Sequence, residues 1–388
     1  MKVLIICKDT TTTAPGIVYK KIIKALSEYA NCDIICPSFT KQLDNCVNRL
    51  PTCTFPKIRY GLEQILYNLF GTNIVDYIWS FFELIRISKF ISDRDYDFVL
   101  SFVSTNNYAP LILGRAISSK TKRTWGIYAV DAIPSPLAWT TNPKQRKIVY
   151  HFLNKYIPKA DLLLSANPSM LKYELKSFPK FKGVSSVVLT PCEELQDTLI
   201  NTTHDDIVTF LYTGNIYGAR KVDSLLAGFK HFYQNNPKSR LIFVGNIPST
   251  CLAGYEDLAE IQIIQNHSYT TDLTKFYSYA DVLIDIGSVF RDDVFLSSKI
   301  SNYLQYGKII IAITEEGSPA REMMSGVESI IHCHHNEEEV YNAMKKVAGL
   351  IEHPIVDRKD LIYNFLPGTV AKQLFEFLEG YKGNNKNV

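Results

Sequence analysis

The sequence predicts an α/β fold of two doubly wound, Rossmann-like parallel-sheet domains in tandem. Three observations lead to this prediction. Short apolar runs of strand length alternate with longer runs of helical period along most of the chain. A polar segment without apolar periodicity, 193–206, interrupts this alternation, which then restarts. The length of 388 residues suits two domains of about 150–200 residues each.

The first half opens with a strand, a helix and a second strand. The apolar run KVLIIC (2–7) predicts a strand, and the polar loop KDTTTTAPG separates it from the helical pattern of 17–30. The strand CDIICPS (32–38) follows, and this spacing favours a parallel sheet. Further strands are predicted at 96–104, 123–131, 160–167 and 185–192, and further helices at 60–70, 74–91, 109–118 and 144–157.

The second half repeats the alternation. Its predicted strands are 207–214, 239–246, 261–266, 280–287, 308–314 and 328–333, with helices between them. A last amphipathic helix ends in the polar tail GNNKNV. We therefore expect domains at 1–195 and 205–368. Ligands of such folds bind beyond the carboxyl ends of the strands, and two such domains are expected to enclose a cleft.

The composition is that of an ordinary globular protein, with 46% hydrophobic and 21% charged residues. A formal net charge of +3 implies no polyanionic partner, so nucleic acid is not expected. Eight scattered cysteines include no C-x-x-C pair and are expected to be reduced. The start MKVLIICKD lacks the features of a secretory signal, and no apolar run reaches 18 residues. A cytoplasmic location is expected.

The segment FLSSKISNYLQYGKIIIAIT (295–314) predicts a phosphate site. A helix is expected to begin near Leu296, where unpaired N–H groups and the helix dipole attract anions. Ser297 and Ser298 can cap the helix and donate hydroxyl groups. Lys299 opposes the dipole in the first turn, which is unfavourable unless an anion binds there. The alternative is a solvated lysine on an ordinary helix.

A second segment, LYTGNIYGARKVDSLLAGFKHF, has the same layout. The predicted strand ends at Gly214, a second glycine follows at Gly218, and a helix is expected from about Val222. Arg220 and Lys221 lie at the start of that helix, after glycines that allow the backbone to approach a ligand closely. Two basic helix starts beyond strand ends suggest one diphosphate held from two sides, by an arginine fork and a lysine.

These two segments and ADVLIDIG together resemble the donor-binding domain of the GT-B glycosyltransferases, in particular glycosyltransferase family 4. The resemblance is specific over about 205–350 and general over 1–190. It implies that Gly214, Asn215 and Arg220 bind the donor diphosphate, and that Ser297 through Ile309 form the second donor segment. It also implies that a C-terminal helix, within 369–388, crosses back to the N-terminal domain.

The chain departs from the family pattern at three positions. The family commonly has a glutamate that holds the donor ribose where this chain has Asn302. Ile309 stands where proline is usual, and Asn215 where an arginine is usual. An asparagine can still hydrogen-bond a hydroxyl group, but more weakly than a carboxylate. Arg220 and Lys299 are left as the main cations.

Two places in the N-terminal half are expected on the acceptor side. One is the loop after the first strand, which ends in Pro15 and Gly16 and in such folds approaches the acceptor or the sugar. The other is Asp131, expected at a strand end before AIPSP. Asp131 could orient a sugar hydroxyl, or act as a base if the enzyme inverts. The alternative is that it caps a helix or a turn.

Three other patterns have competing interpretations. DRDYD (93–97) has the D-x-D spacing of a metal site but precedes its strand, so a solvated turn is expected. HCHH (332–335) has zinc-like ligands but no second cluster. The helices of 60–92 either pack on the sheet or touch a membrane surface. Membrane contact would use Trp79, Phe81, Phe82, Ile85 and Ile87 with Arg86 and Lys89, and Asp76 and Glu83 would oppose it.

The sequence thus predicts a GT-B glycosyltransferase that moves a sugar from a nucleotide-diphosphate donor to a glycan or polyprenyl-linked acceptor, in surface polysaccharide or glycoconjugate biosynthesis. The catalytic residues expected are Asp131, Arg220 and Lys299. The resemblance implies retention of anomeric configuration, with no metal and no cofactor. A cytoplasmic protein at the inner face of the membrane is expected. The alternatives are a sugar-nucleotide epimerase on the same fold and a non-catalytic module that binds sugar nucleotides or glycans.

Overall fold

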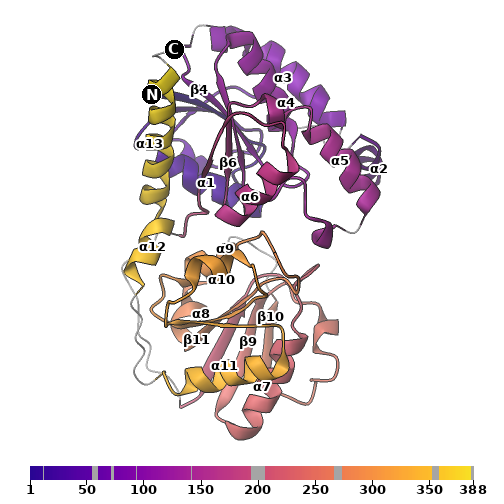
Figure 1. The fold of residues 1–388 in the computed structure, drawn as a ribbon, viewed down its shortest axis with the longest axis vertical. Helices are drawn as coiled ribbons and strands as arrows, with labels where there is room; N and C mark the ends of the chain where they lie inside the picture. Colours follow the sequence, from indigo (N-terminus) through magenta and orange to yellow (C-terminus); the bar gives the residue numbers. More distant parts are fainter. Residues whose placement is uncertain are drawn as a thin grey trace. The chain divides into compact units, whose positions relative to one another are not determined.

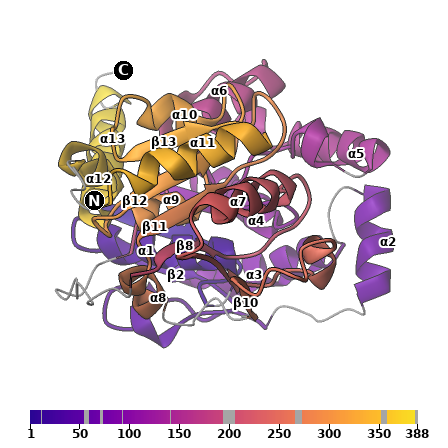
Figure 2. The same cartoon turned by 90° about the horizontal axis from the view of Figure 1, so that it is seen from below.

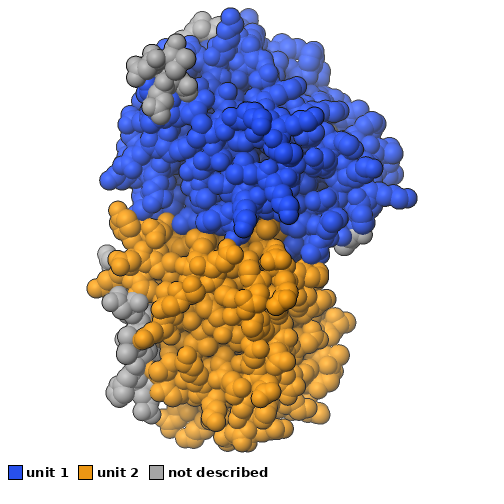
Figure 3. All heavy atoms as spheres, viewed as in Figure 1, with its two compact units in different colours: residues 1–191, 366–388 blue, residues 192–365 orange. Residues whose placement is uncertain are grey.

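The structure is a computed structural model of the chain. It describes residues 1–11, 13–54, 60–70, 74–92, 94–140, 142–193, 206–265, 273–351 and 358–385. The chain divides into two compact units (Figure 3): unit 1 is Met1–Pro191 with Leu366–Val388, and unit 2 is Cys192–Phe365. Each unit contains one parallel sheet flanked by helices, so the predicted fold class is confirmed.

Unit 1 is built on a seven-stranded sheet with the strand order β3-β2-β1-β4-β5-β6-β7. All of its strand pairs are parallel. The order reverses between β1 and β4, and ligands of doubly wound sheets bind at the carboxyl ends beside such a reversal. The strands are β1 (Lys2–Ile6), β2 (Asn31–Ile35), β3 (Asn48–Arg49), β4 (Phe98–Val103), β5 (Thr124–Ala129), β6 (Leu162–Ser165) and β7 (Val184–Val187).

Two apolar clusters cover the unit 1 sheet, which explains why its central strands are almost entirely apolar. One contains side chains of α3, α4 and α5, and the other contains side chains of α1 and α13. Helix α13 packs against α1 (Figure 1), and Lys382 Nζ lies 2.6 Å from Asp97 Oδ1. The helices are α1 (Ala14–Leu26), α2 (Tyr60–Phe70), α3 (Ile74–Ser92), α4 (Ala109–Thr121), α5 (Pro143–Leu153), α6 (Pro168–Ser177) and α13 (Pro367–Asn385).

Unit 2 has a six-stranded parallel sheet with the order β10-β9-β8-β11-β12-β13, which reverses between β8 and β11. Helices α7 and α11 lie side by side on one face of this sheet (Figure 2). The strands are β8 (Val208–Thr213), β9 (Ser239–Gly245), β10 (Ile261–Gln265), β11 (Val282–Ile286), β12 (Ile309–Ile313) and β13 (Ile330–Cys333). The helices are α7 (Asp223–Asn235), α8 (Thr274–Tyr279), α9 (Ser298–Tyr303), α10 (Pro319–Met324), α11 (Glu337–Ala348) and α12 (Lys359–Phe365).

The start of α1 corrects one sequence prediction. Thr13 caps this helix, because its Oγ1 accepts a hydrogen bond from the Gly16 nitrogen at 3.1 Å. Pro15 and Gly16 therefore belong to the first helical turn and not to the preceding loop. Proline is favoured there because the first turn has no intrahelical use for its nitrogen. The sequence analysis also missed the two-residue β3 and the helix α6. Most of the predicted linker lies outside the described residues.

Among the described residues, no helix combines the length and the apolar character needed to cross a bilayer.

Candidate functional site

The carboxyl ends of β8 and β11 meet at the point where the strand order of unit 2 reverses. Gly214 follows β8 with a φ of 107°, a conformation that suits glycine. Gly245 lies so close to it that an added Cβ would overlap the Gly214 carbonyl. The loops after the two strands are joined, because the Val289 nitrogen donates to the Ala219 oxygen at 3.1 Å. Closely packed glycine backbone therefore forms this edge, at the place where doubly wound folds bind ligands.

Lys299 extends over this edge from the start of α9. Its side chain passes directly over Gly214, since a Cβ on that glycine would overlap Lys299 Cε. The Nζ atom donates to Tyr212 Oη at 3.0 Å and lies 4.8 Å from the centre of the tyrosine ring. The backbone nitrogen of Lys299 donates to Ser297 Oγ at 3.3 Å, which caps the helix. Lys299 is thus held at the end of β8, half-buried.

Arg220 brings a second cation to the same place. Its guanidinium lies 5.1 Å from the centre of the Tyr217 ring. Burial of the ammonium and, to a lesser extent, the charge of Arg220 lower the pKa of Lys299 to about 7, against the opposing effect of the nearby Asp285. The basic residues of two separate sequence segments therefore lie within electrostatic reach of each other. A diphosphate placed between them would relieve their repulsion.

Asp285 and Tyr212 are site residues that the sequence analysis missed. Asp285 is an acid within the apolar strand β11, and only 1% of its surface is exposed. Among the described residues, no group hydrogen-bonds its Oδ1. Tyr212 Oη, besides accepting from Lys299, donates to the Asn215 carbonyl at 3.0 Å. The second aspartate of ADVLIDIG, which stands among apolar residues, was the available signal, because an acid is rarely buried without a charged partner.

The side-chain oxygens of Asn215 and Asn302, the two asparagines of the donor segments, accept hydrogen bonds from the backbone of the protein itself. Asn215 Oδ1 accepts from the Asn246 nitrogen at 3.2 Å, which ties the loop after β8 to the end of β9. Asn302 Oδ1 accepts from the Glu193 nitrogen at 2.9 Å. The carbonyl of Asn302 therefore anchors the entry of the chain into unit 2, and its NH2 group is the part that could donate to a ribose hydroxyl.

The helix starts differ in detail from the expected ones. Helix α9 begins at Ser298, which is exposed, and has only six residues. Helix α7 begins at Asp223, so Arg220 and Lys221 precede it. Lys221 is exposed to solvent. The cations of the site therefore act mainly through their own charges, with less help from helix dipoles than the sequence suggested.

On the acceptor side, Asp131 lies two residues beyond the end of β5, whereas the sequence analysis expected it as the last residue of the strand. It is half-buried, and its Oδ2 accepts from the Thr105 nitrogen at 3.2 Å, just after β4. The Asp131 charge and, above all, burial raise the pKa of Tyr19, whose ring lies 6.4 Å from that of Tyr128. Asp131 thus stands at the carboxyl edge of unit 1, beside the first turns of α1.

Glu174 is a second carboxyl group at this edge. It is fully buried on α6, accepts from the Ile133 nitrogen at 3.1 Å and hydrogen-bonds with the Ser165 hydroxyl. Burial raises the pKa of Glu174 to about 8, and the charge of Asp131 acts in the same direction. Glu174 is therefore a neutral carboxylic acid at neutral pH, and it holds the backbone two residues after Asp131.

We expect Glu174 to make unit 1 less stable as the pH rises towards 8. The folded state keeps a proton that the unfolded chain releases at lower pH, so stability falls through the interval up to the folded pKa. Through Glu174, the free energy of unfolding should fall by up to about 1.4 kcal/mol per pH unit within this interval. Glu174→Gln imitates the protonated acid and should remove the contribution. The check is the melting temperature of both proteins from pH 6 to 9. A constant difference between them would contradict the assigned protonation.

The two metal-like patterns have structural roles. Asp95 pairs with Arg123, and Asp97 with Lys382 of α13. His334 lies 2.8 Å from Glu339 Oε2 and 3.0 Å from Glu316 Oε1, which links the ends of neighbouring strands. Within the described ranges, no group of three or more His, Cys, Asp or Glu side chains could hold a metal ion.

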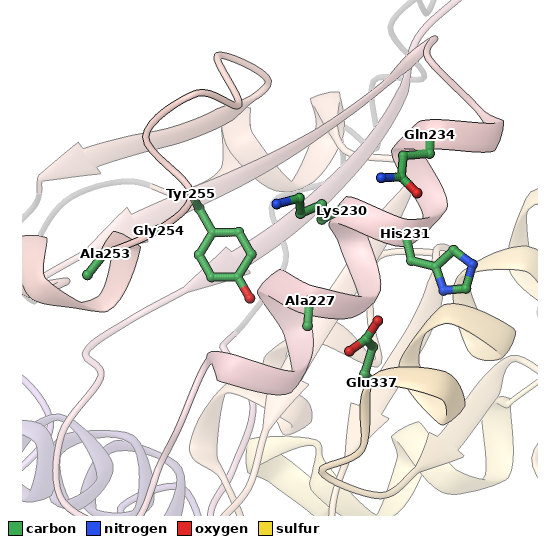
Figure 4. Close-up of a pocket in the computed structure, with 8 residues that line it drawn as sticks. All are labelled: Ala227, Lys230, His231, Gln234, Ala253, Gly254, Tyr255 and Glu337. Carbon is green, nitrogen blue, oxygen red and sulfur yellow. The ribbon is translucent and has the colours of Figure 1, made fainter.

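A separate open depression lies on the helical side of unit 2 (Figure 4). Its volume is about 610 Å³, and it is bordered by α7, the segment around Tyr255 and the start of α11. Lys230 Nζ lies 5.8 Å from the centre of the Tyr255 ring. None of the predicted donor residues lines this depression, and the Lys230, His231 and Gln234 side chains on its rim are exposed. A nucleotide bound in this depression would therefore lie at a different site from the one at the β8/β11 edge.

Solved structures with the same fold cover nearly the whole chain. A glycosyltransferase from Rickettsia africae is 14% identical, with a TM-score of 0.65 and 98% of each chain covered. Anabaena Alr3699/HepE, solved in complex with UDP and glucose, is 13% identical, with a TM-score of 0.63 and coverage of 98% of this chain and 99% of that one. The UDP-GlcNAc 2-epimerase from Neisseria meningitidis, solved bound to UDP-GlcNAc, is 12% identical, with a TM-score of 0.55 and coverage of 98% and 100%.

No protein-family profile and no curated protein sequence matches this chain. At identities of 12–14%, the structural matches establish the fold, which is GT-B. This fold includes both transferases and epimerases of sugar nucleotides, so function has to be argued from the site.

Proposed function

We propose that the protein is a glycosyltransferase that uses a nucleotide-diphosphate sugar, with a UDP-sugar as the first donor to test. The observation that carries this proposal is the convergence of Lys299, Arg220 and the Gly214 backbone at the β8/β11 reversal. Two cations beside one buried carboxylate leave a net positive charge in a partly desolvated place. A diphosphate matches that charge. The fold neighbours solved with UDP or a UDP-sugar support the choice of nucleotide.

The proposed chemistry is stabilisation of the leaving diphosphate. As the bond between the sugar carbon and the phosphate oxygen breaks, negative charge develops on the diphosphate. Lys299 and Arg220 would neutralise this charge, and Tyr212 would orient the Lys299 ammonium through the 3.0 Å contact. The acceptor hydroxyl forms the new bond to the sugar carbon and loses its proton. Fixed cations of this kind can do the work that Mg²⁺ does in other transferases.

We further infer that unit 1 binds the acceptor, with Asp131 orienting a hydroxyl group at the carboxyl edge of its sheet. The resemblance to glycosyltransferase family 4 favours a retaining reaction that needs no metal. Activity should then persist in the presence of EDTA. A glycan or polyprenyl-linked acceptor, a cytoplasmic location at the inner membrane face and a role in surface glycoconjugate synthesis complete the proposal.

An epimerase is the second candidate, because the fold neighbours include one. Epimerisation at a sugar carbon needs acid and base groups that remove and return a proton. At the β8/β11 edge, Asp285 is buried and interacts electrostatically with the two cations, and His335 contacts the backbone of Gly287 and Ser288 after β11. This arrangement favours departure of the diphosphate over proton transfer to the sugar. A non-catalytic sugar-nucleotide module is the third candidate.

Incubation with UDP-sugars distinguishes these candidates. A transferase without its acceptor should release UDP slowly, an epimerase should convert the sugar, and a binding module should do neither. Binding is detected first, as a rise in melting temperature with UDP-sugars and UDP but a smaller rise with UMP, which lacks the second phosphate. If no nucleotide diphosphate raises the melting temperature at millimolar concentration, the proposal of a nucleotide-sugar enzyme is wrong.

A further inference from the structure

Helix α3 carries an apolar face on its solvent side. Seven large apolar side chains on this helix are exposed, among them Phe81 (61%), Phe82 (58%) and Ile85 (57%). The others are Ile74, Tyr77, Ile78 and Phe90. These positions recur at three- and four-residue spacing, so most of them share one side of the helix. The opposite side holds Trp79, Ile87 and Ile91, which are buried in the core against α4.

A surface helix usually exposes its acidic residues and buries its large apolar ones, and the acidic residues of α3 do the opposite. Both of its acids are buried: Asp76 is 2% exposed and Glu83 is 0% exposed. Glu83 Oε2 accepts from the Cys53 nitrogen at 2.9 Å, and Trp79 Nε1 donates to the Cys53 oxygen at 3.2 Å. The acids expected from sequence to repel an anionic membrane thus point inwards. Conversely, Trp79 and Ile87 are core residues, as the alternative of packing on the sheet predicts for them.

The preceding helix continues this exposure. Leu62, Ile65, Leu69 and Phe70 of α2 are each more than half exposed. Exposed apolar residues are common singly, but a set along one side of a single helix is typical of an interaction surface. We call the seven exposed apolar residues of α3 the apolar face of unit 1.

Basic residues border the apolar face on two sides. Arg86 and Lys89 of α3 are exposed beside it. On the other flank, a cavity of about 250 Å³ between α3 and α4 is lined by Lys120, Arg94 and Arg123. Arg94 pairs with Asp33 and Arg123 with Asp95, so Lys120 supplies the positive charge of this flank. Lys120 Nζ donates to Ser88 Oγ at 2.8 Å at this cavity. An apolar centre with basic flanks is the charge pattern of a helix that lies on an anionic bilayer.

We propose that the apolar face of unit 1 docks on the surface of an anionic lipid bilayer, with α3 lying in the interface. The aromatic rings of Phe81 and Phe82 enter the boundary between headgroups and acyl chains. Arg86 and Lys89 contact lipid phosphates on one side. The cavity with Lys120 receives a phosphate-bearing headgroup on the other. This inference deepens the proposed function, because it places the acceptor-binding unit where a lipid-linked acceptor would be.

The charges favour a bilayer over a second copy of the chain. In a twofold dimer the same patch meets itself, so the basic flanks of two copies would come near each other. Such like-charge contacts are unfavourable. A bilayer with anionic headgroups supplies the opposite charge along the whole face.

The test is flotation of the full-length protein with vesicles of neutral phosphatidylcholine alone or with about 30% phosphatidylglycerol. We expect binding to the anionic vesicles, weakened by salt. A triple substitution, Phe81→Ser, Phe82→Ser and Ile85→Ser, should reduce this binding roughly tenfold or more. Lys89→Glu with Lys120→Glu should reduce it on anionic vesicles. The matched control is Leu137→Ser, which removes an equally exposed apolar residue (62%) outside the two helices and should bind normally.

Two outcomes would overturn the inference. One is a wild-type protein that binds neither vesicle, and the other is a folded triple variant that binds as well as the wild type. If light scattering shows a dimer that the triple variant converts to a monomer, without vesicle binding, the face is a contact between copies. The donor proposal is tested separately, since Lys299→Met should lose nucleotide binding and keep vesicle binding. Melting temperatures show that each variant is folded.

Discussion

Replacing Arg220 by alanine is expected to lower the turnover of a UDP-sugar by a hundredfold or more, measured as UDP release. The guanidinium lies beside Lys299 at the end of β8, where charge develops on the leaving diphosphate. Loss of one fixed charge stabiliser typically costs about 10²–10³ in rate. The melting temperature should fall only modestly, because the substitution removes the favourable contacts of Arg220 with Tyr217 and Asp285 together with its repulsion of Lys299.

Lys221→Ala is the matched control for this variant. Lys221 is adjacent in sequence and carries the same charge, but its side chain is exposed to solvent. Its removal should leave the rate close to that of the wild type. Equal losses from Arg220→Ala and Lys221→Ala would mean that general positive charge matters, and not the geometry at the end of β8.

The affinity for a UDP-sugar is expected to fall as the pH rises above 7. Burial and the neighbouring Arg220 lower the pKa of Lys299 to about 7, so the ammonium loses its proton at a pH where an ordinary lysine keeps it. A bound diphosphate favours the charged form and raises this pKa. Between the two values the dissociation constant should increase about tenfold per pH unit, because binding then takes up one proton. Titration calorimetry from pH 6.5 to 9 measures this.

Lys299→Arg and Lys299→Met are the informative variants. Arginine stays charged at all these pH values, so its affinity should be nearly independent of pH. Methionine removes the charge and should abolish binding. It should also stabilise the ligand-free protein below pH 7. At that pH the folded state holds the Lys299 proton more weakly than the unfolded chain does, which lowers the free energy of unfolding. This destabilisation declines as the pH rises above 7. A pH-dependent affinity that persists in Lys299→Arg would assign the titration to another group.

The layers of the fold could be predicted from sequence, because apolar runs bounded by turn residues identify buried parallel strands. Helix starts were less accurate. Pro15 and Gly16 read as loop residues, although Thr13 caps a helix that contains both. β3 was missed because two residues carry no periodic signal.

The residues of the candidate site also divide into those that the sequence predicted and those that only the structure identified. The chain segments that supply Lys299 and Arg220 were identified from their charges at strand ends. The role of Tyr212 could not be predicted, because it depends on the 3.0 Å contact between Tyr212 Oη and a lysine 87 residues away. Asp285 was visible as an acid in an apolar strand, but its interaction with both cations depends on the folded arrangement of β8, β11 and α9. The inward direction of Asp76 and Glu83 likewise follows from packing on the core.

A crystal structure with bound UDP tests the central claim most directly. We expect the diphosphate at the carboxyl ends of β8 and β11, with phosphate oxygens within about 3 Å of both Lys299 Nζ and the Arg220 guanidinium. A nucleotide found instead in the depression between α7 and α11, or at the sheet edge of unit 1 near Asp131, would contradict the assignment of this donor site.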